Sequence, residues 1–163
     1  KSLTMRLRTD LGYGDSFGDT TRMPFFKNFY AGGFGSVRGF EKNTLGPRDR
    51  PAEIDNQDPD PFGGNVLIEG SAEVLFPLPF IRDQRSIQSS VFVDVGQVFD
   101  TDCGDKDDDL CQEPDVGELR YSVGIGGTWN STFGPLTFSL AKPLNAGEFD
   151  EEEVFQFSMG QTF

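Results

Sequence analysis

The sequence predicts an all-β fold, an antiparallel transmembrane β-barrel to which this chain supplies about the last six strands. Three observations support this prediction. Apolar and polar residues alternate in six stretches, the connections between the stretches are alternately long and short, and 17 Phe stand against three Tyr and one Trp. Strict alternation is the period of a half-buried strand. A membrane explains so many Phe in an acidic chain of 163 residues.

Each alternating stretch predicts a strand with one apolar and one polar face. In the third stretch, for example, Val91, Val93 and Val95 alternate with Ser90 and Asp94. The polar faces carry Gly, Ser, Thr and charged residues, as a water-filled lumen would, whereas the apolar faces hold almost no polar residue. This favours a barrel wall between water and lipid over a soluble sandwich. The six stretches span residues 3–13, 65–74, 90–96, 119–129, 136–141 and 155–163.

The connections follow the pattern of outer-membrane barrels, which have short periplasmic turns and long extracellular loops. A long loop, residues 15–64, follows the first stretch, and a Pro-rich turn lies near Pro77. A long acidic loop, a short turn at 130–134 and a second acidic loop come next. Strands of a soluble sandwich have no reason to keep this rhythm.

Six strands do not close a membrane barrel, since the smallest have about eight, and an open sheet would leave backbone groups unpaired in lipid. We therefore expect the C-terminal part of a larger barrel, with a closing strand at 154–163 and the missing part N-terminal. No run of about 18 apolar residues predicts a transmembrane helix. No leader opens the chain, so we expect a mature or internally cut fragment, located in the outer membrane of a Gram-negative bacterium.

Composition argues against several functions. The net charge of −13 argues against a nucleic-acid partner. The chain has no His, which excludes Ser-His-Asp and Cys-His catalysis and imidazole metal sites within it. We expect no enzyme, no cofactor and no metal. Three acidic blocks, 53–60, 100–109 and 148–153, are expected to be solvated extracellular loops without chemistry.

Two cysteines, Cys103 and Cys111, flank the sequence GDKDDDL. A pair so close together in a polar loop predicts a local disulfide, which fits an oxidising compartment. A calcium loop is the alternative, but the D-x-D-x-D-G order and the terminal Glu are missing.

The long loop contains a run of Gly and aromatic residues at 28–40. It is no phosphate loop, because it lacks the G-x-G-x-x-G spacing and a following GK[ST]. Its end, Val37-Arg38-Gly39-Phe40, resembles the VRGF motif of the Omp85 superfamily, as do the flanking residues 29–33 and 43–47 and the terminal residues 155–160. The resemblance covers essentially the whole chain. It implies a barrel of about sixteen strands behind periplasmic POTRA domains, with the motif loop folded back into the barrel.

The resemblance also implies a function. It is closest to the members that insert β-barrel proteins into the outer membrane without covalent chemistry. The expected partners are outer-membrane lipid, unfolded β-barrel clients and, through POTRA domains absent from this chain, lipoproteins of the assembly machinery. A related transporter, of the TamA type or a two-partner secretion pore, is the alternative. A passive porin is a further alternative, but it would lack the VRGF motif.

The phase of the strands nominates partners for Arg38. Glu69 and Glu73 lie on the polar face of the second stretch, and Asp94 is the only carboxylate on that of the third. A guanidinium can hold a loop by bidentate bonds to carboxylates. In the resembling family the motif Arg meets carboxylates at the positions of Glu73 and Asp94, so we expect a lumenal ion pair. A solvent-exposed Arg38 without a partner is the alternative.

The last stretch places apolar residues at alternate positions and ends on an aromatic residue: Phe155, Phe157, Met159 and Phe163. Gly160 adds no side chain to the packing. The resemblance implies that a short, poorly paired last strand forms a seam with the first strand, through which clients enter the bilayer. One departure is the cysteine pair, which in relatives lies in the motif loop and here lies in the next one, so loop-specific details are not carried over.

Overall fold

The structure is a computed structural model that describes residues 3–19, 23–49, 58–79, 86–103 and 111–160. Within these ranges it is built from strands and two short 3-10 helices. None of the helices in the described part has the length and apolarity needed to cross a membrane.

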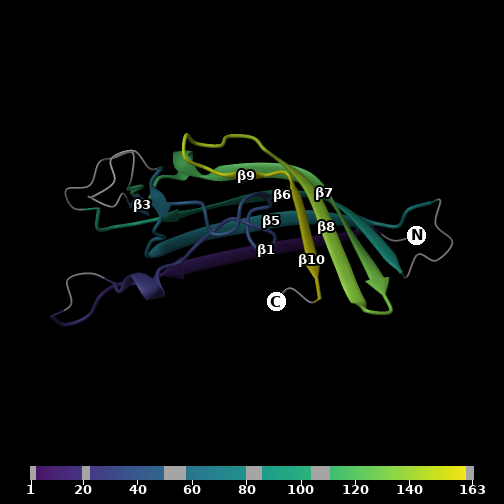
Figure 1. Cartoon of the computed structure of the whole chain (residues 1–163), viewed down its shortest axis with the longest axis horizontal. Coiled ribbons are helices and arrows are strands. Elements are labelled where there is room, and N and C mark those ends of the chain that lie inside the picture. The colour runs from purple at the N-terminus through teal and green to yellow at the C-terminus, as the bar shows by residue number, and fades with distance from the viewer. Residues whose placement is uncertain (1–2, 20–22, 50–57, 80–85, 104–110, 161–163) are drawn as a thin grey trace.

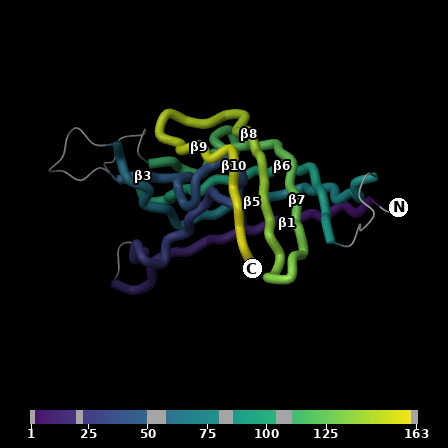
Figure 2. Tube along the Cα trace, turned by 45° about the vertical axis from the view of Figure 1, so that its right-hand side comes forward, coloured from purple at the N-terminus to yellow at the C-terminus, as the bar shows by residue number. Residues whose placement is uncertain are grey.

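Six strands form one sheet in the order β1-β5-β6-β7-β8-β10, and every pair is antiparallel. This confirms the predicted all-β antiparallel fold. The strand direction rotates steadily from β1 to β10, so the sheet is curved like part of a barrel wall (Figures 1 and 2). The connections after β1, β6 and β8 leave from one end, and those after β5 and β7 from the other. The strands are β1 (Thr4–Tyr13), β5 (Val66–Phe76), β6 (Ile87–Phe99), β7 (Arg120–Ser131), β8 (Gly134–Pro143) and β10 (Phe155–Met159).

The convex face of the sheet carries the apolar side chains. Val93, Ile125 and Leu140, from three neighbouring strands, are 48%, 55% and 46% exposed. A soluble protein would bury such a face, whereas a lipid bilayer covers it. Other members of this outward band are Met5, Leu7, Leu11, Tyr121, Val123, Trp129, Phe138, Phe155 and Phe157.

The loop between β1 and β5 covers the inner face of the sheet, as the resemblance implied for the motif loop. Its residues Ala31, Val37, Phe40 and Leu45 form a buried cluster with Val98 of β6. The small residues of the polar faces therefore make room for a packed loop. The short elements of this loop are η1 (Phe25–Lys27), β2 (Gly39–Phe40), β3 (Arg48–Asp49) and β4 (Asp60–Pro61).

The acidic blocks are not all solvated loops, which corrects the prediction. In the block 148–153, β9 (Glu152–Glu153) pairs with β2, and the Asp150 side chain is only 6% exposed. Backbone pairing and a buried ion pair, both invisible in the local sequence, dock this block. In the block 100–109, Asp100 is buried. Residues 50–57 and 104–110 lie outside the described residues.

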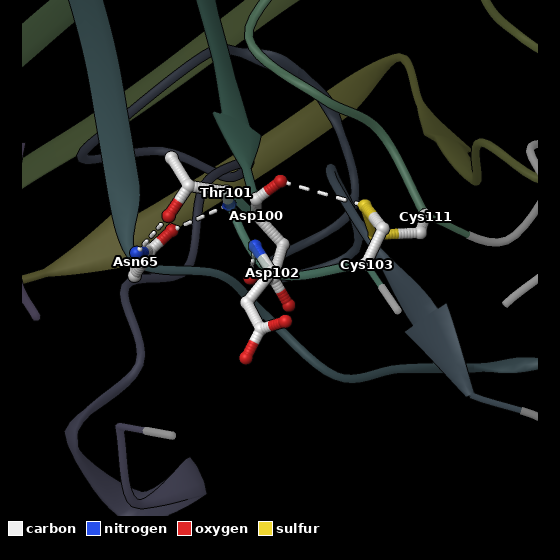
Figure 3. The surroundings of a disulfide bond; sticks show 6 residues. All are labelled: Asn65, Asp100, Thr101, Asp102, Cys103 and Cys111. Carbon is white, nitrogen blue, oxygen red and sulfur yellow. Dashed lines mark hydrogen bonds between the residues drawn. A yellow bond between two sulfur atoms is a disulfide. The ribbon is translucent and has the colours of Figure 1, made fainter. Parts of the chain in front are cut away.

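The connection after β6 contains the predicted disulfide between Cys103 and Cys111 and then η2 (Val116–Glu118). Nearby, Asn65 donates to Thr101 Oγ1 at 2.7 Å and accepts from the Thr101 amide at 2.9 Å (Figure 3). The Asp100 amide donates to the carbonyl of Gln112 at 2.9 Å, beyond the disulfide. The crosslink thus closes a loop that is also held at its base. By restricting the unfolded chain, closing so short a loop raises the free energy of the unfolded state by about 2–3 kcal/mol in the chain-entropy model.

Candidate functional site

The VRGF motif crosses the inner face from β6 toward β10. The Val37 side chain is fully buried against Gly96 of β6, where an added Cβ would lie 2.7 Å from Val37 Cγ2. Gly39 has φ +93°, and a Cβ there would lie 3.1 Å from Ala141 Cβ on β8. Glycine is required at 39 for both reasons, since L side chains avoid this φ and the wall is too close.

The structure brings Arg38 together with Glu73 and Asp94, two of the three carboxylates that the strand phase nominated and the two that the resemblance implied. Arg38 donates from Nε to Asp94 Oδ2 at 2.7 Å and from Nη2 to Asp94 Oδ1 at 2.9 Å. Its Nη1 donates to Glu73 Oε1 at 3.2 Å. Its Cζ also lies 3.3 Å from the ring centroid of Phe92. A bidentate pair stacked on an aromatic ring fixes the position and the plane of the guanidinium.

Both carboxylates are themselves held in place. The hydroxyl of Ser71 donates to Asp94 Oδ1 at 2.6 Å, and that of Ser90 donates to Glu73 Oε1 at 2.8 Å. The Arg38 and Glu73 side chains are each 12% exposed, and Asp94 is fully buried. The cluster is thus largely removed from water. In such an environment charged hydrogen bonds are strong and an unpaired charge is costly.

Three further contacts were missed by the sequence analysis. Arg6 of β1 donates to Glu73 Oε2 at 3.1 Å and extends the cluster to a third strand. Glu69 does not reach Arg38; it accepts from the hydroxyl of Ser36, which also accepts from the Gly32 amide at 2.8 Å. The strand phase could have suggested Arg6, because it lies on the inner face of its stretch, but no pattern in the loop pointed to Ser36.

A second junction ties the motif to the segment before β10. Gly39 and Phe40 pair with Glu153 and Glu152. The Glu41 amide donates to the Glu151 carbonyl at 2.8 Å. Sequence reasoning had no way to find this pairing, because both partners are very short and lie far apart in the chain.

A second buried ion pair lies at the loop end of the sheet. Arg120, at the start of β7, donates from Nε to Asp150 Oδ2, and the two side chains are 9% and 6% exposed. Asp150 also accepts from the Gly147 amide at 2.6 Å. The pair holds the connection between β8 and β9 against β7.

The predicted seam residues lie at the sheet edge. Phe155, Phe157 and Met159 point outward and are 54–69% exposed. Gly160 has φ +99°, and its amide donates to the Pro135 carbonyl at 2.9 Å. Phe163 lies outside the described residues. The described ranges contain no group of three or more His, Cys, Asp or Glu side chains suited to hold a metal ion.

The pKa of the Glu41 carboxyl is raised by its hydrogen bond with Glu151 and by that group's charge, then by slight burial and the charge of Glu153. A carboxyl with a raised folded-state pKa binds protons better when folded. The contact between β2 and β9 should therefore strengthen as the pH falls and weaken as the pH rises through that pKa. Glu41→Gln should remove this pH dependence, read as amide exchange of residues 39–41 followed as the pH rises above the ordinary range of a carboxyl. An unchanged pH dependence would contradict the assignment. Glu148→Gln, at an exposed site in the neighbouring loop, is the matched control.

Comparison with known proteins defines the class first. Residues 1–163 match the Omp85 superfamily domain, so the chain belongs to the Omp85 superfamily. Within it, the chain is similar to the outer membrane protein assembly factor BamA. It is 39% identical over 183 aligned residues to BamA of Neisseria meningitidis, covering 100% of this chain and 22% of that protein. It is 32% identical to BamA of Neorickettsia risticii, covering 99% of this chain and 19% of the relative.

Among solved structures, a crystal structure of Haemophilus ducreyi BamA lacking POTRA domains 1–3 matches with a TM-score of 0.80 and 38% identity. The match covers 95% of this chain and 30% of that one. The chain therefore corresponds to part of a larger barrel of the outer membrane of Gram-negative bacteria. It spans about a fifth of the length of the curated relatives.

Proposed function

We propose that this chain is the C-terminal barrel part of a non-enzymatic factor that inserts β-barrel proteins into the outer membrane. The observation that carries the proposal is the Arg38 cluster. Arg38 is held by Asp94 and Glu73 on the inner wall, and the motif that contains it belongs to a chain 39% identical to an assembly factor. An anchored lumenal loop fits a protein that must keep its barrel shaped while one seam opens.

In this proposal the loop 15–64 is the lumenal element and the strand 154–163 is the closing strand. The strand would form a lateral seam with the first strand of the complete barrel, and β-barrel clients would enter the bilayer there. The partners would be lipid, unfolded clients and lipoproteins bound through POTRA domains. The short β10 supports this role: within the described residues its ladder with β8 runs from Phe155 to Met159, whereas β7 pairs with β8 from Ser122 to Ser131.

The test is a thiol crosslink between Met159→Cys, on β10 next to Gly160, and a cysteine in the first strand of the complete barrel. The crosslink should abolish client insertion while the barrel stays folded, because the seam can no longer part. A matched crosslink between Thr128→Cys and Thr137→Cys, which face each other on β7 and β8, should leave insertion intact. Full insertion with a complete seam crosslink would contradict lateral opening. Steady ion conduction without insertion would favour a porin, and export of a soluble substrate would favour a transporter.

A further inference from the structure

The closing strand β10 is attached to the rest of the molecule through the motif as well as through β8. Its residue Gln156 points inward and is 4% exposed. The side-chain amide donates to the Phe40 carbonyl at 2.8 Å and to Glu153 Oε2 at 3.0 Å. One side chain of the strand therefore holds both halves of the junction between β2 and β9.

We propose that Gln156 is a positioning residue through which the Arg38-anchored motif holds the closing strand in place. Arg38 and Phe40 are two residues apart in the motif. One is bonded to β5 and β6, and the other is bonded to β10. The motif thus forms a strut across the inner face. Breaking its bonds at Arg38 would loosen β10, and breaking the bond to Gln156 would loosen the motif.

The burial of Gln156 supports a specific role for its amide. Its oxygen has no hydrogen-bond partner within the described part of the chain, and neither has the hydroxyl of Ser139, its cross-strand neighbour on β8. Leaving buried polar atoms unpaired destabilises the folded state. An apolar residue would fill this site without that cost, so the position is explained by the bond that its nitrogen makes to Phe40.

The bond from Gln156 to Phe40 matters because the backbone pairing of β10 with β8 is short. Within the described residues the ladder of β10 with β8 extends over Phe155–Met159, with one further backbone bond beyond each end, and β10 is the last strand in the sheet order. A strand held by few backbone bonds opens locally at low free energy. A single buried side-chain bond is therefore a large share of what keeps β10 in position.

The test is amide hydrogen exchange of the full-length protein in lipid nanodiscs. Gln156→Leu keeps the volume and removes the donor, and it should speed exchange in residues 155–160 about tenfold. Residues 87–99 and 120–131 should stay unchanged. Ser158→Ala, the next inward position on β10, is the control and should have no effect. Arg38→Ala should speed exchange in the same β10 residues, and adding Gln156→Leu should give no further increase.

Unchanged β10 exchange in Gln156→Leu would overturn the proposal. It would also fail if Arg38→Ala left β10 untouched or if the two substitutions multiplied their effects, since the strut would then not connect the two ends. One consequence of the inference rests on the proposed function, namely that the strut sets how readily the seam opens. Exchange is read without clients, so a chain that never inserts clients would refute the function and leave the strut standing.

Discussion

Replacing Arg38 by alanine is expected to release the motif loop from the barrel wall and to remove most client insertion, while the six-stranded sheet stays folded. The guanidinium makes charged bonds to Asp94 and Glu73 at 2.7–3.2 Å. Its loss leaves a fully buried Asp94 carboxylate without its cation. Breaking a buried pair in this way costs about 3–5 kcal/mol. That cost falls on the docking of the loop, because the backbone pairing of β5 with β6 does not involve the motif.

The partner substitutions make the prediction specific. Asp94→Asn should give a similar defect, because it removes the charge and turns an amide toward the guanidinium. The double variant should be clearly less than additive, as residues in one network are. Arg6→Ala is the control, since Arg6 also bonds Glu73 but is 64% exposed, and exposed pairs contribute about 0–1 kcal/mol.

Three measurements decide the outcome. Client insertion into liposomes reports function, urea unfolding of the folded barrel reports stability, and protease sensitivity of the loop reports docking. A loss of barrel stability as large as the loss of function would mean that the motif serves the fold alone. Strictly additive effects of Arg38→Ala and Asp94→Asn would mean that the ion pair is not what holds the loop.

The phase of the strands predicts which side chains face the inside of the barrel. Because side chains alternate with period 2, the apolar positions alone determine that Glu73 and Asp94 share the inner face. The family resemblance then identified Arg38 as their partner. In the structure Arg38 contacts both Glu73 and Asp94. The outward apolar band followed from the same phase.

Loop docking could not be predicted in this way. Asp150 and Gln156 are buried because segments far apart in the chain meet: Gln156 bonds Phe40, which lies 116 residues away. No sequence periodicity connects such positions. The charge content of the block 148–153 led to a wrong prediction of a solvated loop, because a block rich in acidic residues normally lies in water. Glu151, Glu152 and Glu153 do expose their side chains, but their backbone is bonded to the motif.

The Arg120–Asp150 pair leads to the second large effect. Asp150→Ala is expected to detach the connection between β8 and β9 and to loosen the β2–β9 junction. Arg120 would keep a weaker contact to Glu118, whose side chain is 51% exposed. The Gly147 amide would lose its acceptor as well. Stranding a guanidinium that is only 9% exposed should cost about 3–5 kcal/mol of docking free energy.

The detachment should stop at Asn145, which bonds the backbone on both sides of Arg120, donating to the Leu119 carbonyl and accepting from the Tyr121 amide. Asp150→Ala should therefore speed exchange in residues 147–153 and in β2 but not in β7. Glu148→Ala removes the same charge type from an exposed position in the same loop and should do nothing. Arg120→Ala combined with Asp150→Ala should be milder than the sum of the two, because neither charge is then left buried alone. If Glu148→Ala matched Asp150→Ala, the loop would be responding to its net charge, and the buried pair would not be what holds it.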